Sequence, residues 1–458
     1  MLNDTIAAIS TPLGEGGIGI VRLSGQKAVE IADKIFKGKD KVSNFLTHTI
    51  HYGQIIEPVT CEVIDSVLLS IMRAPKTYTC EDIIEINAHG GIILLNRILE
   101  VVLSSGARLA EPGEFTKRAF LNGRIDLSQS EAVVELIRAK TNLAAKFALS
   151  QLIGNLYKEI SNLRQQIVSL LAELEVGIDF YEEDIELLST DEILDRLNKS
   201  KKEIEQLIEN AKYGKILQQG VITTIIGRPN VGKSSLLNAL VGQPRAIVTH
   251  IPGTTRDVIE EMIDIEGVPL IVVDTAGLRH TVDIIEEEGV RRAREALTQA
   301  DLVIFVMDGS ENITSDDTKI MDEIKDKETI IIINKFDLPQ LIEIDKIKKY
   351  LPDKPIINLS ATQKIGLNEL KKIIKKIFFA GKILSTDELI ITNIRHKEAL
   401  KSSLQNINTA INAIENNLSF EFVAVDLREL LDNLGLIVGE TVTEDILNEI
   451  FSKFCIGK

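Results

Sequence analysis

Along the first 120 residues, apolar side chains occur mostly in short runs bounded by Gly, Pro and polar residues, the pattern of β-strands. Two other segments, 27–36 and 91–105, repeat their apolar residues every three to four positions and predict helices. The runs that predict strands are 5–9, 18–23, 49–56, 63–72 and 83–86. Residues 1–120 are therefore expected to form a mixed α/β domain.

From residue 112 the pattern becomes helical, with leucines and isoleucines at helical spacing over 142–174. Ser followed three residues later by Glu is a capping box, a common helix start. This signature predicts helices that begin at Ser128, Ser189 and Ser385, the first reaching about 139 and the second about 212. Further helices are expected at 394–416, 425–434 and 444–454.

A second α/β region lies between these helical segments. Its apolar runs predict strands at 221–226, 270–273, 329–333 and 355–359. Because helices lie on both sides, the economical interpretation is one helical domain, 121–217 with 380–458, that carries the α/β domain 218–379 as an insertion at an exposed turn. The expected fold class is multidomain, with an α/β N-terminal domain, an all-α helical domain and an inserted α/β domain whose sheet is mostly parallel.

The run 221–226 leads into Gly-Arg-Pro-Asn-Val-Gly-Lys-Ser at 227–234, the P-loop pattern, and a helical pattern follows. In such a loop, backbone N–H groups and the helix N-terminus bind phosphate. Lys233 is expected to reach the terminal phosphates, and the Ser234 hydroxyl to coordinate Mg²⁺. A glycine turn that matches by chance is the alternative, but the flanking strand and helix favour phosphate binding. The residues expected to bind nucleotide here are Asn230, Val231, Gly232, Lys233, Ser234 and Ser235.

Three further motifs follow the remaining strands of this domain, where open α/β sheets bind ligands. Asp-Thr-Ala-Gly at 274–277 can reach the Mg²⁺ shell and the γ-phosphate. In Asn-Lys-Phe-Asp, the Asp337 carboxylate can accept two hydrogen bonds from guanine that adenine cannot supply. Each motif alone is weak, but their order predicts an inserted P-loop GTPase domain that binds GTP rather than ATP. The residues concerned are Asp274, Thr275, Ala276, Gly277, Asn334, Lys335, Asp337, Ser360, Ala361 and Thr362.

The hydrolysis machinery departs from that of many regulatory GTPases. Leu278 stands where a Gln often orients the attacking water, so another group must do so. A carboxylate of the run 286–288 is one candidate, and an ordinary charged helix start is the alternative interpretation of that run. Asn230 can ligate a monovalent cation beside the phosphates. Thr254 and Thr255 are the switch candidates, one of which completes the Mg²⁺ shell.

Composition and charge limit the classes of function and the cellular location that the sequence allows. The 458 residues carry a net charge of −16, which argues against non-specific nucleic-acid binding as the main activity. No apolar run reaches the length of a membrane span, and the N-terminus resembles neither a secretory signal nor a transit peptide. Cys61, Cys80 and Cys455 lie too far apart for a zinc pattern or a disulfide framework. These features predict a cytoplasmic protein without a membrane span.

Three other features leave alternatives open. The glycines of 14–19 match G-x-G-x-x-G, but they lead into a strand rather than a helix, so we reject a dinucleotide site. His89 lies before a predicted helix, and a helix cap is favoured over a functional imidazole. The final Phe-Cys-Ile-Gly-Lys, 454–458, either frays or projects into a site.

Taken together, these features resemble the MnmE (TrmE) family of tRNA-modification GTPases. The P-loop, Gly-Thr-Thr-Arg-Asp at 253–257 and Asp-Thr-Ala-Gly-Leu-Arg at 274–279 are shared with several related GTPases. The architecture and the C-terminal Phe-Cys-Ile-Gly-Lys single out this family. The N-terminal segments that agree with it are 4–6, 16–20, 111–115 and 118–122, so the resemblance covers essentially the whole chain.

For the N-terminal domain, the resemblance implies a homodimer contact and a bound tetrahydrofolate derivative, 5-formyl- or 5,10-methylene-tetrahydrofolate. The motif before the matching glutamate usually reads Tyr-Thr-Gly-Glu-Asp, and this chain has Cys80 in place of the glycine. The positions that match the folate residues are Arg22, Glu81, Arg124 and Lys458.

For the nucleotide domain, the resemblance implies Mg²⁺ at Ser234 and Thr255. It also implies that Glu286 positions the attacking water once two nucleotide domains meet across the dimer, with Lys233 as the other catalytic residue there. The implied K⁺ ligands are Asn230, Thr249, Ile251 and Thr254, and Thr249, Thr254 and Thr255 also contact the nucleotide.

The implied process is carried out with an FAD-dependent partner, MnmG (GidA), in a heterotetramer. The pair adds an aminomethyl or carboxymethylaminomethyl group at C5 of the wobble uridine of certain tRNAs. Cys455 is implied to be required for this activity, and a buried inert thiol is the alternative. A function of another class is a ribosome-assembly GTPase switch without modification activity, but the sequence has no dedicated basic RNA-binding stretch to favour it.

Overall fold

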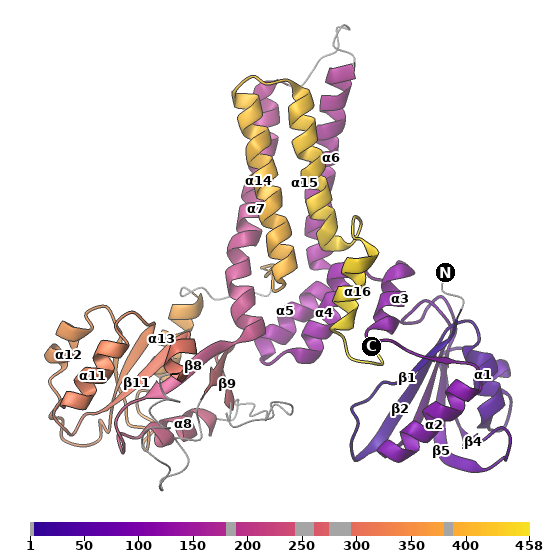
Figure 1. The fold of residues 1–458 in the computed structure, drawn as a ribbon, viewed down its shortest axis with the longest axis horizontal. Helices are drawn as coiled ribbons and strands as arrows, with labels where there is room; N and C mark the ends of the chain where they lie inside the picture. Colours follow the sequence, from indigo (N-terminus) through magenta and orange to yellow (C-terminus); the bar gives the residue numbers. More distant parts are fainter. Residues whose placement is uncertain (1–3, 180–188, 243–260, 274–294, 380–387) are drawn as a thin grey trace. The chain divides into compact units, whose positions relative to one another are not determined.

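The computed structural model describes residues 4–179, 189–242, 261–273, 295–379 and 388–458 (Figure 1). The chain divides into two compact units. The first comprises Met1–Val134, Gln151–Leu187 and Ser419–Lys458, and the second comprises Glu135–Ser150 and Leu188–Leu418. Among the described residues, no helix combines the length and the apolar character that a membrane span needs.

The N-terminal part of the first unit is a seven-stranded sheet in the order β3-β4-β5-β6-β2-β1-β7. Its strand pairs are antiparallel except for β1 with β7. Side chains from the sheet and from helices α1 and α2 share one core. The bounds are β1 Ile6–Ile9, β2 Gly16–Ser24, α1 Ala28–Ile35, β3 Phe36–Lys37, β4 Thr49–Ile56, β5 Val63–Met72, β6 Ile83–Gly90, α2 Ile92–Ser104 and β7 Arg108–Leu109.

Helices complete the first unit. Helices α6 and α15 lie side by side (Figure 1), and Arg428 Nη2 lies 2.5 Å from Glu175 Oε1 between them. Side chains of α4 and α16 form a separate apolar cluster with Phe454. The bounds are α3 Glu114–Leu121, α4 Leu127–Arg138, which continues into the second unit, α6 Asn155–Asp179, α15 Phe420–Val438 and α16 Glu444–Ser452.

Two helix predictions are wrong in detail. Ser128 lies inside α4, and the capping box is instead formed by Asp126 and Gln129. Asp126 Oδ1 accepts from the Gln129 backbone N–H at 3.2 Å, and Gln129 Oε1 accepts from the Asp126 N–H at 3.0 Å. The single helix expected over 142–174 is divided into α5 (Asn142–Leu152) and α6 at Gly154, which has a left-handed φ of 96°.

The second unit contains a six-stranded sheet in the order β13-β12-β11-β8-β10-β9. Only β9 with β10 is antiparallel, so the prediction of a mostly parallel sheet is confirmed. One core includes α8, α13 and the end of α7, and a second core includes α11 and α12. The bounds are β8 Val221–Ile226, α8 Lys233–Val241, β9 Glu261–Ile265, β10 Val268–Val272, β11 Leu302–Asp308, α11 Ser315–Glu323, β12 Thr329–Asn334, α12 Ile344–Tyr350, β13 Ile356–Asn358 and α13 Leu367–Phe379.

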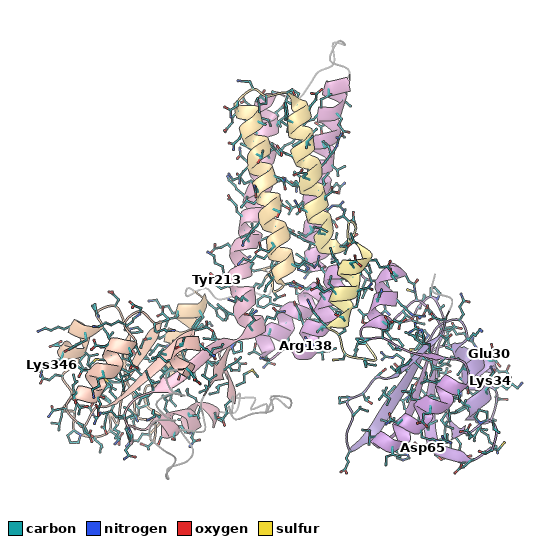
Figure 2. The ribbon with its side chains drawn as sticks, viewed as in Figure 1. Glu30, Lys34, Asp65, Arg138, Tyr213 and Lys346 are labelled. Atoms are coloured by element: carbon teal, nitrogen blue, oxygen red, sulfur yellow. The ribbon has the colours of Figure 1, made fainter. Side chains whose placement is uncertain are left out.

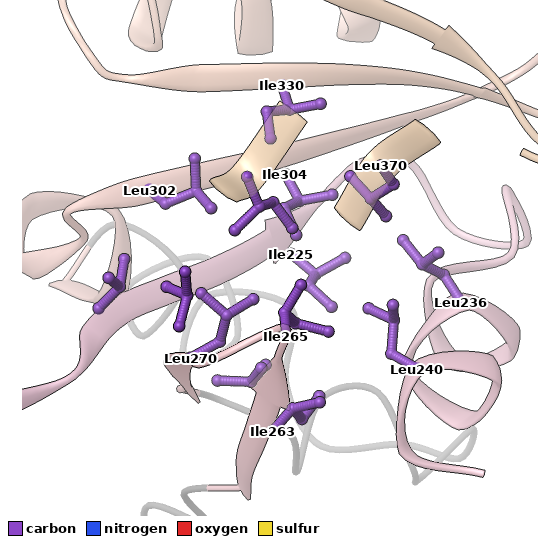
Figure 3. Close-up of a cluster of buried hydrophobic side chains, with 14 of the residues drawn as sticks. Ile225, Leu236, Leu240, Ile263, Ile265, Leu270, Leu302, Ile304, Ile330 and Leu370 are labelled. Atoms are coloured by element: carbon purple, nitrogen blue, oxygen red, sulfur yellow. The ribbon is translucent and has the colours of Figure 1, made fainter. Parts of the chain in front are cut away.

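Figure 3 shows part of the first of these cores, where Leu236 and Leu240 of α8 lie among side chains of β8, β9 and β10. Strands β11 and β12 of the same sheet are apolar on both sides, as expected where helices cover both faces. The carboxyl ends of β8, β11 and β12 consequently carry the polar residues that are free to meet a ligand.

Helix α7 (Thr190–Gln219) begins at the predicted capping box of Ser189 and Glu192 and runs into β8, past the expected end near 212. It lies side by side with α14 (Ile394–Glu415). Tyr213, labelled in Figure 2, packs edge-on against Phe379 with ring centroids 6.1 Å apart. The capping box predicted at Ser385 lies outside the described residues.

We expect Gly214→Ala to destabilise the protein by about 1–3 kcal/mol, although alanine favours helices. A Cβ at Gly214 would lie 1.9 Å from the Ile391 carbonyl oxygen, a backbone atom that cannot rotate away. The matched control is Gly435→Ala in α15, where the nearest atom is the Thr441 Oγ1 at 2.9 Å, on a side chain that can move. Thermal unfolding that ranks the two variants equally would contradict this explanation.

Candidate functional site

The loop 227–234 joins β8 to α8 with the geometry that a P-loop requires. Gly227 has a φ of 149°, and a Cβ there would lie 2.2 Å from the Val306 carbonyl oxygen. Gly232 is the N-cap of α8, with a φ of 99°, and a Cβ there would lie 2.1 Å from Asn334 Nδ2. Only glycine fits at both positions, so the glycines of the motif are set by backbone conformation and by close packing.

Lys233 is the first residue of α8, and its ammonium group lies over the loop. It donates to the carbonyl oxygens of Gly227 and Arg228, both at 2.8 Å. Burial lowers the pKa of Lys233 from its ordinary value. Ser234 and Ser235 follow in the first turn of α8, where backbone N–H groups point out of the helix.

Asn334, at the end of β12, joins three of the sequence motifs. Its Nδ2 donates to the Val231 carbonyl oxygen of the P-loop at 2.8 Å. Its Oδ1 accepts from the Ala361 backbone N–H at 3.1 Å. The side chain is 3 % exposed. The structure therefore brings the P-loop, 334–337 and 360–362 together at one edge of the sheet, as the order of the motifs predicts.

Two other residues of the motif 334–337, Lys335 and Asp337, are less buried than Asn334. Lys335 has a left-handed φ of 61°, and its Nζ lies 2.6 Å from Asp308 Oδ2. Asp337 is exposed, as a residue that must meet a ligand should be. Ser360 Oγ lies 3.2 Å from Thr362 Oγ1 and accepts from the Gln363 backbone N–H at 3.3 Å, which shapes the short turn after β13.

Many of the predicted nucleotide and metal residues lie outside the described part of the chain. Asn230 is described: it is exposed, at the tip of the loop, with a left-handed φ of 62°. In the described ranges, no group of three or more His, Cys, Asp and Glu residues is arranged to hold a metal ion. The residues that lie outside are Thr249, Ile251, Thr254, Thr255, Asp274, Thr275, Ala276, Gly277, Leu278 and Glu286.

In the N-terminal domain, Arg22 and Arg124 each lie beside an aromatic ring, with Arg22 Cζ 5.6 Å from the centre of the Phe115 ring. The Arg124 guanidinium lies 5.3 Å from the centre of the Tyr78 ring and donates to the Thr77 carbonyl oxygen. Burial raises the pKa of Tyr78, while the charges of Arg22 and Arg124 oppose that shift. Two of the residues expected to bind folate thus each lie beside an aromatic side chain, Arg22 beside Phe115 and Arg124 beside Tyr78.

Arg22 is held from two sides. Its Nε donates to Glu85 Oε1 at 2.8 Å, and its Nη1 donates to the Gly457 carbonyl oxygen at 3.1 Å. Gly457 has a φ of 89°, and a Cβ there would lie 2.5 Å from the Ile9 carbonyl oxygen. The C-terminal tail therefore packs against the N-terminal domain rather than fraying, with Cys455 exposed and Lys458 half-buried.

Glu81 belongs to a buried ionic cluster centred on Arg118, which is 1 % exposed. Arg118 Nη1 lies 3.2 Å from both Glu81 oxygens, and its Nη2 donates to Asp4 at 2.7 Å and to Glu114 at 3.0 Å. Ser24 Oγ also donates to Glu81 Oε2 at 2.7 Å. These contacts fix the orientation of the Glu81 carboxylate.

His89 does not cap α2: it is the penultimate residue of β6, and its Nδ1 lies 2.8 Å from Asp65 Oδ1. The cap of α2 is Gly91. Cys80 has a left-handed φ of 61°, a conformation that glycine adopts without strain.

Three charged residues near these sites were not singled out from the sequence, namely Asp308, Asp317 and Arg118 as the centre of an ionic cluster. Each has a partner that is distant in the chain: Lys335 for Asp308, Arg228 for Asp317, and Asp4 and Glu81 for Arg118. The local signals are weak: Asp308 ends an apolar strand, and Asp317 forms a capping box with Thr314.

Comparisons with known proteins cover nearly the whole chain. The family described as GTP-binding protein TrmE N-terminus matches residues 5–124, and the family described as MnmE helical domain matches residues 127–455. The tRNA modification GTPase MnmE of Staphylococcus epidermidis is 50 % identical over 456 residues, 99 % of each chain. The protein of the same name from Staphylococcus aureus is 49 % identical over the same length.

Among solved structures, the G domain of the T. maritima FeoB iron transporter is similar to part of the chain. It is 28 % identical, and the match covers 34 % of this chain and 96 % of that domain with a TM-score of 0.26.

We expect stability to fall as the pH drops through the titration of Glu114. Burial raises the pKa of Glu114, but hydrogen bonds from Arg108 and Arg118 outweigh it and hold the pKa below its ordinary value. A carboxyl whose pKa is depressed on folding stabilises above its unfolded pKa, near 4.3, and this stabilisation disappears as the pH falls through the folded value. Unfolding followed from pH 7 to pH 3 tests this.

Glu114→Gln should remove about 3 kcal/mol at pH 7, because it leaves Arg108 and Arg118 with less compensating charge. It should also flatten the fall in stability below about pH 4.3, where the carboxyl of the unfolded wild type takes up a proton before that of the folded protein does. The control is Glu100→Gln, at an exposed surface pair with Arg97. Parallel pH profiles for wild type and Glu114→Gln would contradict the assignment.

Proposed function

The chain belongs to the MnmE family of tRNA modification GTPases, and we propose that its hydrolysis of GTP depends on K⁺ and on dimerisation of its GTPase domains. As a member, it is a GTP hydrolase that acts in tRNA modification. We further propose that, with the FAD-dependent MnmG (GidA) protein, it adds an aminomethyl or carboxymethylaminomethyl group at C5 of the wobble uridine of certain tRNAs. The GTPase part of this proposal rests on the two hydrogen bonds by which the Asn334 side chain joins the P-loop to 360–362.

In this proposal the described residues bind and orient GTP. The N–H groups of 230–235 surround the β- and γ-phosphates, and Lys233 exchanges its two carbonyl contacts for phosphate oxygens. Asp337 accepts from the guanine N1–H and amino group, while the Lys335 stem covers the base. A backbone N–H of 360–362 donates to the guanine carbonyl. Thr249, Thr254, Thr255 and 274–277 complete the contacts.

Two cations fit the donor sets of this site. Hydroxyl oxygens of Ser234 and Thr255 suit Mg²⁺, and the amide oxygen of Asn230, with Thr249, Ile251 and Thr254, suits K⁺. When bound, these cations supply the positive charge that phosphoryl transfer needs in a chain where Leu278 replaces the usual glutamine. Glu286 holds the attacking water in line with the γ-phosphate.

We assign the region around Tyr78 to the tetrahydrofolate derivative, which supplies the one-carbon unit when bound. Two guanidinium groups, Arg124 beside the Tyr78 ring and Arg22 beside the Phe115 ring, suit a ligand that carries carboxylates and flat rings, and Glu81 offers a carboxylate to ring N–H groups. Lys458 lies next to Gly457, whose carbonyl orients Arg22. The exposed Cys455 thiol is available for its proposed role in the reaction.

We propose a homodimer through the N-terminal domains, assembled with MnmG into a heterotetramer in the cytoplasm. In support, β4 and β5 expose apolar side chains that are close together: Tyr52 pairs with Leu68, and they are 71 % and 49 % exposed. Ile50, on the same face of β4, is 66 % exposed. The proposed domains are 1–120, 121–217 with 380–458, and 218–379.

Hydrolysis is expected to be at least about tenfold faster in K⁺ than in Na⁺ at equal ionic strength. Asn230→Gly should remove most of that difference, because it deletes the amide ligand while glycine keeps the φ of 62° without strain. Steady-state phosphate release in the two salts measures both effects. Equal rates for the wild type would exclude a K⁺ ligand at Asn230.

Nucleoside mass spectrometry of tRNA from cells depleted of the protein tests the modification itself. We expect loss of the modified wobble uridine, restored by the intact gene but not by a gene that lacks 455–458. The control gene carries Cys61→Ser, which alters the other exposed thiol. A tRNA modification profile that does not change on depletion, together with stalled ribosomal subunits, would instead support the ribosome-assembly switch.

A further inference from the structure

Residues 308–317, from the end of β11 to the first turn of α11, contact the phosphate-binding loop through Arg228. Arg228 Nε donates to Asp317 Oδ1 at 3.0 Å, and Nη2 donates to Glu311 Oε2 at 2.9 Å. The Asp317 side chain is 1 % exposed, whereas that of Glu311 is 56 % exposed. The buried partner is therefore expected to dominate, since exposed ion pairs contribute little.

Asp317 is itself held rigidly. Its Oδ2 accepts from the backbone N–H and the hydroxyl of Thr314 at 2.9 and 2.8 Å, which forms the capping box of α11. Because one oxygen binds Thr314 and the other binds Arg228, the carboxylate has a fixed orientation. Arg228 in turn presents its carbonyl oxygen to Lys233 Nζ at 2.8 Å. The chain of contacts thus runs from α11 to the lysine of the P-loop.

The same segment contacts the guanine motif at its other end. Asp308 Oδ2 lies 2.6 Å from Lys335 Nζ, and its Oδ1 accepts from the Ser310 N–H at 2.9 Å. The Gly309 N–H donates to the Asn334 carbonyl oxygen at 2.9 Å. Asp308 is 3 % exposed, so its ion pair with Lys335 is shielded from solvent on the carboxylate side.

We propose that 308–317 is a positioning element for GTP, in which Asp317 holds the phosphate-binding loop through Arg228 and Asp308 holds the guanine motif through Lys335. Neither carboxylate touches the nucleotide in this proposal. Asp317 acts on phosphate binding alone, and Asp308 acts on the recognition of the base. The proposal rests on the assignment of 227–234 and 334–337 to GTP.

The test compares GTP with ITP, which lacks the exocyclic amino group, in the full-length protein by competition against a fluorescent GTP analogue. Asp317→Asn should weaken GTP and ITP by the same factor, about tenfold, and leave their affinity ratio unchanged. Asp308→Asn should lower the ratio of GTP to ITP affinity at least about threefold, because Lys335 and Asp337 belong to one turn. If the two substitutions only disturbed the fold, each variant would lose affinity for GTP and ITP alike. The ratio of GTP to ITP affinity would then be the same in both variants.

Glu311→Gln is the matched control, because it alters the other, exposed partner of Arg228 and should change GTP affinity less than about twofold. Should Asp317→Asn unfold on melting analysis, Arg228→Lys takes its place, with an expected intermediate loss of GTP affinity. Affinities of Asp317→Asn or Arg228→Lys within twofold of the wild type, or equal to those of Glu311→Gln, would overturn the phosphate half of the proposal. Equal losses of GTP and ITP in Asp308→Asn would overturn the other half.

If the wild-type protein binds no GTP, the assignment of 227–234 and 334–337 to GTP is wrong. If a variant binds GTP like the wild type, only the positioning proposal is wrong.

Discussion

The nucleotide site depends on the two hydrogen bonds of the Asn334 amide. One reaches the carbonyl of Val231 in the P-loop and the other the N–H of Ala361, so a single buried side chain joins segments more than 100 positions apart in the sequence. An amide suits this role because it donates and accepts in one plane. Gly232 is the complementary requirement, because any Cβ there would occupy the space of the Asn334 amide.

A second constraint organises the N-terminal domain. Arg118 is almost fully buried, and the carboxylates of Asp4, Glu81 and Glu114 surround it. Burial of the guanidinium lowers its pKa, but Glu81 and the other carboxylates outweigh this and raise it, so the charge is retained. Because a buried charge that loses a partner is strongly destabilising, the position of Glu81 follows from the folding of this cluster. Glu81 would therefore serve both the stability of this cluster and the folate binding proposed above.

Much of the fold could be predicted from local pattern. The nine strands that were predicted lie close to their predicted bounds, because alternating or continuous apolar runs have few other ways to be buried, whereas β3, β7, β9 and β11 were not predicted. The start of α7 at Ser189 was found as predicted, whereas the start of α4 was not. Asp126 caps the helix two residues earlier by accepting from the N–H groups of Ser128 and Gln129, which leaves Ser128 inside the first turn.

The sequence alone was sufficient to identify the chemistry of the nucleotide site, because a P-loop needs glycine, lysine and serine at fixed spacing along one continuous loop. It was also sufficient for the fold class and for the family resemblance. Only the tertiary structure revealed that Asp317 holds Arg228, that Asp308 holds Lys335 and that Gly457 lies against Ile9. The physical reason is that these contacts join residues far apart in the chain, and an ion pair or a close backbone approach leaves no periodic trace in either segment.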